Sequence, residues 1–188
     1  MSATRIKPPV LSLTAGPVQG YPQVLQAMAK PMGYDYDESF LAFYEETAKR
    51  CAEAMKWPEP ALILQAEPAV AIEAAAASLI AKTDVVLNLA SGVYGKGFGY
   101  WSARYHKEMV EIEVPFNEAI TPESVAEAFR QRPDISVVSL VHHDTPSGTV
   151  NPAVEIGKIV ADHGALLIVD AVSSFGGMDI DPLACHAD

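Results

Sequence analysis

Short apolar runs alternate with stretches of helical pattern along most of this chain, and this alternation constrains the fold more than any other feature. Each run has the length of one strand, and each stretch between runs is long enough for one helix. Such alternation is typical of βαβ units, which build a mainly parallel sheet with helices on both faces. We therefore predict an α/β fold with three layers, helix–sheet–helix. The expected strands are residues 61–65, 85–90, 109–114, 135–141 and 166–170.

Helices are expected between these strands, and several have clear start and stop signals. Thr121 and Pro122 suit the cap and first position of a helix, and Gly164 suits the end of the next one. The expected helices are residues 21–29, 37–56, 69–82, 94–105, 121–132 and 151–163.

The charge balance excludes some classes of function. The chain has 24 acidic against 13 basic residues and a net charge of -11, with no Lys/Arg cluster that could neutralise phosphates. We therefore expect no nucleic-acid partner. No apolar run is long enough for a membrane span, and the Pro-rich start does not resemble a signal peptide. A cytoplasmic enzyme is the expected class.

The last apolar run leads directly into a single acid, Asp170, followed by small and hydroxyl residues. Open α/β sheets bind ligands at the carboxyl ends of their strands, and Asp170 is expected there. A carboxylate in such a place is costly unless it has a cationic partner. A protonated pyridine nitrogen would be such a partner.

Three other loops are expected at the same edge of the sheet. Tyr94 could stack on a flat heterocycle, or it could be an ordinary aromatic at a helix start. Thr145 could hydrogen-bond a ligand phenolate, or its turn could be satisfied by its own side chains. The glycine-rich loop around Tyr94 is not a dinucleotide fingerprint, because Tyr100 stands where a third glycine is needed. His142 and His143 are expected to point to opposite faces, so no metal site is predicted.

Glu67 and Pro68 form the most discriminating of these loops. A helix N-terminus at this place could hold a phosphate through backbone N–H groups. Here a carboxylate stands where the anion would lie, and Pro68 removes one donor. The pair should disfavour a phosphate and favour a neutral hydroxymethyl group. Glu67 could also simply favour the positive end of the helix dipole.

These motifs together resemble the class V, fold-type-I aminotransferases. Within that family they are most similar to the enzymes that transfer an amino group between pyridoxamine and pyruvate, giving pyridoxal and L-alanine. The resemblance implies that residues 37–188 are the N-terminal portion of the large ring-binding domain, incomplete at its C-terminus. Residues 1–36 would be an N-terminal arm and substrate loop. The stretches that carry the resemblance are residues 13–18, 34–37, 88–101, 142–149 and 168–177.

The resemblance also implies a role for each site residue. Asp170 would pair with the pyridine nitrogen and keep it protonated, with Tyr94 stacked on one face of the ring and Val172 packed on the other. Thr145 would hold the ring hydroxyl, and Glu67 would contact the hydroxymethyl group. Pyridoxamine and pyridoxal would be substrates, with no tightly bound cofactor expected. Enzymes of this family pair as dimers, so a homo-oligomer is expected for the longer form.

One element of the family is missing from this sequence. The family uses a lysine after the next strand as Schiff-base former and proton shuttle, and only Lys96 of the eight lysines here is near the expected site. We therefore expect an N-terminal portion of the enzyme that is inactive alone. Gln65 and Ala66 also replace the His–Gly pair expected before Glu67. Two alternatives remain: a pyridoxal-phosphate-dependent alanine/serine–glyoxylate/pyruvate aminotransferase, and a non-catalytic ligand-binding or assembly fragment.

Overall fold

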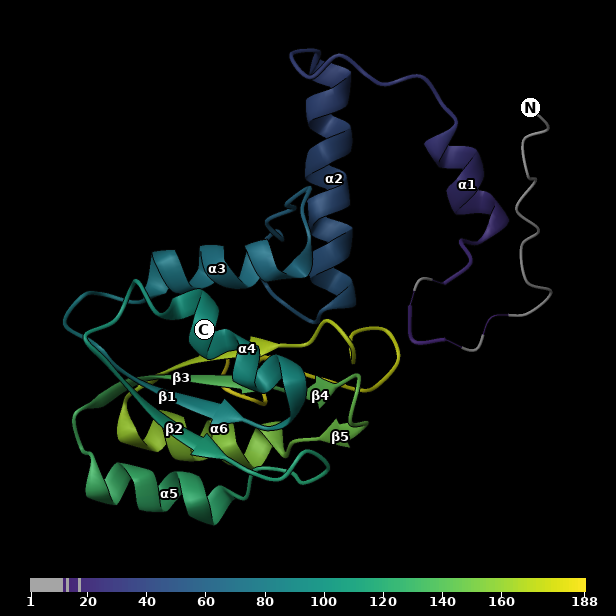
Figure 1. The fold of residues 1–188 in the computed structure, drawn as a ribbon. Helices are drawn as coiled ribbons and strands as arrows, with labels where there is room; N and C mark the ends of the chain where they lie inside the picture. The colour runs from purple at the N-terminus through teal and green to yellow at the C-terminus, as the bar shows by residue number, and fades with distance from the viewer. Residues whose placement is uncertain (1–11, 13, 17) are drawn as a thin grey trace, which may run out of the picture. The chain divides into compact units, whose positions relative to one another are not determined.

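The structure is a computed structural model that describes residue 12, residues 14–16 and residues 18–188 (Figure 1). The chain divides into two compact units, Met1–Ala42 and Phe43–Asp188. The first contains helix α1 (Pro22–Met28) and the start of helix α2 (Glu38–Ala54). The proposed functional division after residue 36 stays a prediction.

The second unit is built on a four-stranded parallel sheet. In space the strands follow the order β2-β1-β3-β6. Chain order moves outward from β1 to β2 and then returns to the other side of β1 for β3. The crevice between the carboxyl ends of β1 and β3 is therefore a topological switch point, where sheets of this kind bind ligands. The strands are β1 (Val85–Ala90), β2 (Glu108–Glu113), β3 (Ile135–Val141) and β6 (Leu166–Asp170).

Helices cover both faces of this sheet, which confirms the predicted three-layer α/β fold (Figure 1). Helices α3 (Pro68–Leu79) and α4 (Gly92–Ser102) pack on one face through a small cluster that includes Phe98. Helices α5 (Pro122–Gln131) and α6 (Ala153–His163) pack on the other face through a larger cluster. Because side chains alternate along a strand, each buried strand supplies residues to both clusters.

The expected strand at residues 61–65 is wrong. Among the described residues it pairs with no other strand, and Leu62 is 93% exposed. The backbone N–H of Ala61 donates instead to the carbonyl oxygen of Ala48 in α2, at 3.1 Å. An apolar run of this length fits a strand, but it forms one only where another strand offers hydrogen bonds.

The expected helix signals are confirmed at two ends. The Thr121 hydroxyl accepts a hydrogen bond from the backbone N–H of Ser124 at 3.2 Å, and Gly164 closes α6 with a φ of 80°. After β3 the chain forms a short hairpin, in which β4 (His143–Asp144) pairs antiparallel with β5 (Thr149–Val150). Over the described part of the chain, no helix combines the length and hydropathy needed to cross a bilayer.

Candidate functional site

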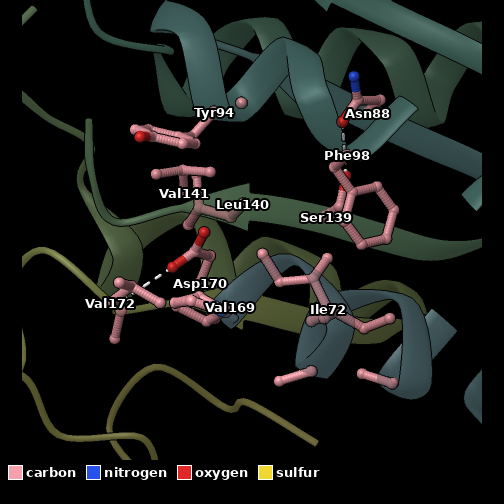
Figure 2. Close-up of a pocket in the computed structure, with 16 residues that line it drawn as sticks. Ile72, Asn88, Tyr94, Phe98, Ser139, Leu140, Val141, Val169, Asp170 and Val172 are labelled. Carbon is pink, nitrogen blue, oxygen red and sulfur yellow. Dashed lines mark hydrogen bonds between the residues drawn. The ribbon is translucent and has the colours of Figure 1, made fainter. Parts of the chain in front are cut away.

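A pocket of about 200 Å³ opens at the carboxyl edge of the sheet, on the face that α3 and α4 cover (Figure 2). Residues from the starts of both helices, from the middle of β1 and from the ends of β3 and β6 meet in it. Its walls are mostly apolar, with a few polar groups among them, as is usual for small-molecule sites. The lining residues include Pro68, Ile72, Asn88, Tyr94, Phe98, Ser139, Val141, Asp170 and Val172.

Asp170 ends β6 and contributes the acid in the pocket wall. Its carboxylate accepts a hydrogen bond from the backbone N–H of Val172 at 2.8 Å, and it forms no salt bridge with any described residue. Burial raises the pKa of Asp170; the Val172 hydrogen bond lowers it, and the nearby Asp144 raises it. An acid held without a cation in an apolar wall fits a ligand that brings its own positive charge.

Tyr94 and Val172 line the same pocket as Asp170. Tyr94 lies in the first turn of α4 and is 44% exposed, and Val172 follows β6 and is 59% exposed. Two such surfaces beside a carboxylate could hold a flat ring between them. The structure therefore brings together three of the five residues selected from the sequence.

The other two selected residues lie outside the pocket lining. Glu67 is the exposed N-cap residue of α3 and makes no side-chain capping hydrogen bond, while Pro68, the next residue, does line the pocket. Thr145 is partly buried in the β4–β5 turn and has no hydrogen bond with the described residues. Both stand in segments next to the pocket, so a contact of either with a ligand stays a prediction.

A polar chain across the sheet was not singled out from the sequence. The Ser139 hydroxyl donates to the Asn88 side-chain oxygen at 2.7 Å, and the Asn88 amide donates to Glu111 at 2.8 Å. Asn88 and Ser139 are buried and line the pocket (Figure 2). Their signal in the sequence is a polar residue inside an otherwise apolar strand, because such a residue needs a buried partner.

Several nearby groups do not join the pocket lining. The His143 ring nitrogen Nδ1 lies 2.6 Å from the Ser173 hydroxyl, and no described group of three or more His, Cys, Asp or Glu residues is arranged to hold a metal ion. The Lys96 ammonium donates to Glu113 at 2.5 Å. None of the lysines in the described residues lines the pocket.

The family model Aminotransferase class-V matches residues 11–188. This chain belongs to the class V aminotransferases. Members of the family generally depend on pyridoxal phosphate and act on small-molecule substrates. The aminotransferase family expected from the sequence is thereby confirmed.

Among curated relatives, the pyridoxamine–pyruvate transaminase of Mesorhizobium japonicum is 57% identical over 96% of this chain. A 2-aminoethylphosphonate–pyruvate transaminase of Pseudomonas fluorescens is 33% identical over 94% of it. The chain covers 46% of the first relative and 48% of the second, so it spans about half the length of the relatives that it matches.

The chain also matches solved structures of aminotransferases. The pyridoxamine–pyruvate aminotransferase of Mesorhizobium loti matches with a TM-score of 0.92 and 57% identity, covering 96% of this chain and 46% of that one. An alanine–glyoxylate aminotransferase from Nostoc sp. matches with a TM-score of 0.88 and 27% identity, covering 98% and 50%. The large domain expected for fold-type-I aminotransferases is thereby confirmed, over about half of each homologue.

Proposed function

We propose that this chain supplies the ring-binding half of a site for amino transfer between pyridoxamine and pyruvate, which gives pyridoxal and L-alanine. The observation that carries the proposal is Asp170, an acid without a cationic partner among the described residues, beside Tyr94 and Val172 in one pocket. The 57% identity to a pyridoxamine–pyruvate transaminase supports the choice of substrates. In this proposal the unphosphorylated vitamer is a substrate, and no cofactor is tightly bound.

Each residue has a defined task in this proposal. Asp170 holds the proton on the pyridine nitrogen, and burial strengthens this pairing because little water competes for either charge. Tyr94 and Val172 hold the ring plane between them. When bound, the protonated ring supplies an electron sink for the carbon that carries the amine.

Two further contacts define the vitamer in the proposal. Thr145 donates its hydroxyl hydrogen to the ring phenolate, and Glu67 accepts a hydrogen bond from the hydroxymethyl group. Neither side chain lines the pocket of the structure, so both contacts require the ligand to reach beyond the lining residues.

We also propose that the protein is cytoplasmic and that its longer form is a homo-oligomer.

A second candidate is a pyridoxal-phosphate-dependent alanine/serine–glyoxylate/pyruvate aminotransferase. The general cofactor dependence of the family and the likeness to an alanine–glyoxylate enzyme favour it. The start of α3 argues against it, because Glu67 adds a negative charge there and Pro68 has no N–H to offer a phosphate.

Equilibrium binding of pyridoxine tests the proposal, because this vitamer has the ring, both hydroxyl types and no reactive amine or aldehyde. Titration of the chain should give saturable quenching of protein fluorescence. Asp170→Asn should weaken binding tenfold or more, because the ring nitrogen loses its counter-ion. The matched control Asp162→Asn removes an exposed carboxylate in α6 and should leave binding unchanged. Equal affinity of the Asp170→Asn chain would contradict the proposal.

A further inference from the structure

A second carboxylate, Asp144, is completely buried at the end of β4. One of its oxygens accepts a hydrogen bond from the backbone N–H of Tyr94 at 2.9 Å. The other accepts from the backbone N–H of Ser147 at 3.1 Å and from the Ser147 hydroxyl at 2.8 Å. Asp144 forms no salt bridge with any described residue. Backbone N–H groups and a hydroxyl therefore stabilise the buried charge.

The bond to Tyr94 makes Asp144 the cap of α4. Ser91 is the N-cap residue, but its side chain makes no capping hydrogen bond, and its hydroxyl donates to the carbonyl oxygen of Glu118 at 2.8 Å. The N–H groups in the first turn of a helix need an acceptor, and a negative charge there also interacts favourably with the helix dipole. Asp144 supplies both functions from a segment 50 residues away.

The backbone at Gly92 makes this approach possible. Gly92 has a φ of +70°, and a Cβ atom at this position would lie 2.2 Å from the Asp144 carboxylate. A larger residue would therefore displace the carboxylate as well as strain the backbone. The fit between Gly92 and Asp144 fixes the distance between the start of α4 and the β4–β5 hairpin.

The bonds to Ser147 connect the same carboxylate to the turn that carries Thr145. The turn closes with a hydrogen bond from the backbone N–H of Gly148 to the carbonyl oxygen of Asp144 at 2.8 Å. One buried side chain thus joins the start of α4 to the β4–β5 turn. Each of these two segments carries one of the proposed ring contacts, Tyr94 in the first and Thr145 in the second.

We propose that Asp144 is a positioning residue of the ring site: its carboxylate sets where the Tyr94 ring and the Thr145 hydroxyl lie relative to Asp170. This inference rests on the proposed function, because it assigns Asp144 to the placement of that ligand. Asp144 itself does not line the pocket and acts only through the two segments that it joins.

The charge of Asp144 also reaches Asp170, whose pKa it raises in addition to the larger effect of burial. A protonated ring placed against Asp170 would lie in the field of both carboxylates. The positioning role and this electrostatic role act in the same direction, because both strengthen the binding of a ring that carries a positive charge.

The first measurement needs no ligand. Hydrogen exchange of the chain, followed by mass spectrometry on a peptide covering residues 92–98, reports the first turns of α4. Asp144→Asn and Asp144→Ala should speed exchange there at least tenfold while exchange in β3 stays within twofold. Ser147→Ala keeps the Tyr94 bond and should leave exchange at α4 unchanged. Unchanged exchange at α4 in both Asp144 variants would overturn the inference, whatever the ligand does.

The second measurement uses pyridoxine and separates positioning from simple capping. The Asp144 variants should bind it five- to fiftyfold more weakly and should lose most of the induced circular dichroism of the bound ring at saturation. Ser147→Ala should bind two- to threefold more weakly and keep the dichroism. Unchanged affinity and dichroism in the Asp144 variants would show that the carboxylate only caps α4, and the inference would fail.

A failure of the proposed function would give a different result from a failure of the Asp144 inference. In that case the unsubstituted chain does not bind pyridoxine, and this removes both proposals together. If the unsubstituted chain binds pyridoxine and Asp170→Asn abolishes binding while the Asp144 variants bind normally, only the role of Asp144 is wrong.

Discussion

At the scale of single residues, the burial of the Asp170 carboxylate, which we propose binds the ligand, works against the stability of the ligand-free chain. Its carboxyl lies in an apolar wall with one backbone hydrogen bond, and burial raises its pKa. An acid with a raised pKa binds its proton more tightly in the folded state, so its contribution to stability falls as the pH rises past the unfolded value of about 3.9. The loss of stability caused by burying the ionised carboxylate is complete only at pH values above the pKa of Asp170 in the folded state.

We therefore expect Asp170→Asn to stabilise the ligand-free chain at pH 7, by roughly 1 kcal/mol. The asparagine oxygen can still accept from the Val172 N–H, and the buried charge is gone. The gain should disappear as the pH falls below about 4, where Asp170 is protonated. Urea unfolding of both chains at several pH values measures this difference. A variant that is less stable at pH 7 would show that the charge has a partner that the structure does not reveal.

Glu67 allows a second test at this scale. Glu67→Ser removes the negative charge at the start of α3 and offers a hydroxyl in its place. Two like charges about 4 Å apart in water repel by about 1 kcal/mol, so binding of pyridoxine 5′-phosphate should improve roughly fivefold. Binding of unphosphorylated pyridoxine should weaken slightly. Parallel titrations with the two vitamers give the ratio of the affinities for the phosphorylated and unphosphorylated forms. Glu59→Ser, at an exposed position, is the control. Tighter binding of the phosphate form by the unsubstituted chain would defeat the repulsion argument.

At the scale of elements, four of the five expected strands form, within one residue of their expected bounds, and the two that pair on both sides are the most deeply buried. Residues 85–90 and 135–141 are nearly all buried and form β1 and β3 as expected. Residues 61–65 have a similar apolar pattern but form no strand, because strand formation depends on a neighbouring edge that the local sequence does not encode. Helix ends were predictable where one residue decides them, as at Thr121, through its hydroxyl, and Gly164, through its positive φ.

The candidate site was predictable where the signal is local. A charge directly after an apolar strand located Asp170, and a ring at a helix start located Tyr94. The cap of α4 was not predictable in the same way, because its donor and its acceptor are 50 residues apart. Only the fold brings Asp144 to that helix, and its sequence context looked like an ordinary turn.

Helix α6 depends on a close approach to the last residues of the chain. A Cβ atom at Gly157 would lie 1.8 Å from the carbonyl oxygen of Cys185, which is backbone and cannot rotate away. Gly157→Ala should therefore lower the free energy of unfolding by about 2 kcal/mol, through displacement of the C-terminal segment. Lys158→Ala, at the next and exposed position of α6, is the control. Chemical denaturation of both variants gives the comparison, and equal stability would mean that the segment moves at little cost.

At the scale of the whole molecule, β6 is an edge of the sheet. It pairs with β3 on one side, and on the other side Leu167 exchanges two hydrogen bonds with Asp188. Alternate residues of a parallel strand point their backbone groups to the same side, so Val169 faces this open edge as well. Beside it lies an apolar hollow lined by residues such as Trp57, Leu62, Leu79 and Phe175.

We expect the 188-residue chain to self-associate through this surface, since unpaired strand edges and exposed apolar groups favour association. The net charge of -11 should slow the process, and added salt should speed it by screening. Light scattering over a dilution series, with and without salt, measures the effect. Leu62→Lys should reduce the association, and Glu59→Gln, which raises the net charge by the same amount at an exposed position, is the control for the change of charge alone. A monomer at every concentration would show that the edge is protected.

The same chain should show no transaminase turnover. None of the lysines in the described residues lines the pocket, and Lys96 pairs with Glu113. The proton transfers of the reaction then have no amine to carry them. The assay is pyridoxal formation from pyridoxamine and pyruvate, with heat-denatured chain as the blank. Turnover of roughly 1 per second or more would mean that a group other than a lysine amine carries out the proton transfers.

Helix α3 starts with a proline, and this small feature bears on how long a ligand stays. A phosphate held at a helix start anchors a ring to its enzyme between reactions. A ring without that anchor keeps only the contacts of its own plane and edges, so it leaves sooner. In the proposed reaction the vitamer would then exchange with the surrounding pool after each turnover, and the rate would follow the supply of free vitamer in the cell. In this sense the first residues of α3 would decide whether vitamin B6 is a lasting component of the enzyme or a passing reactant.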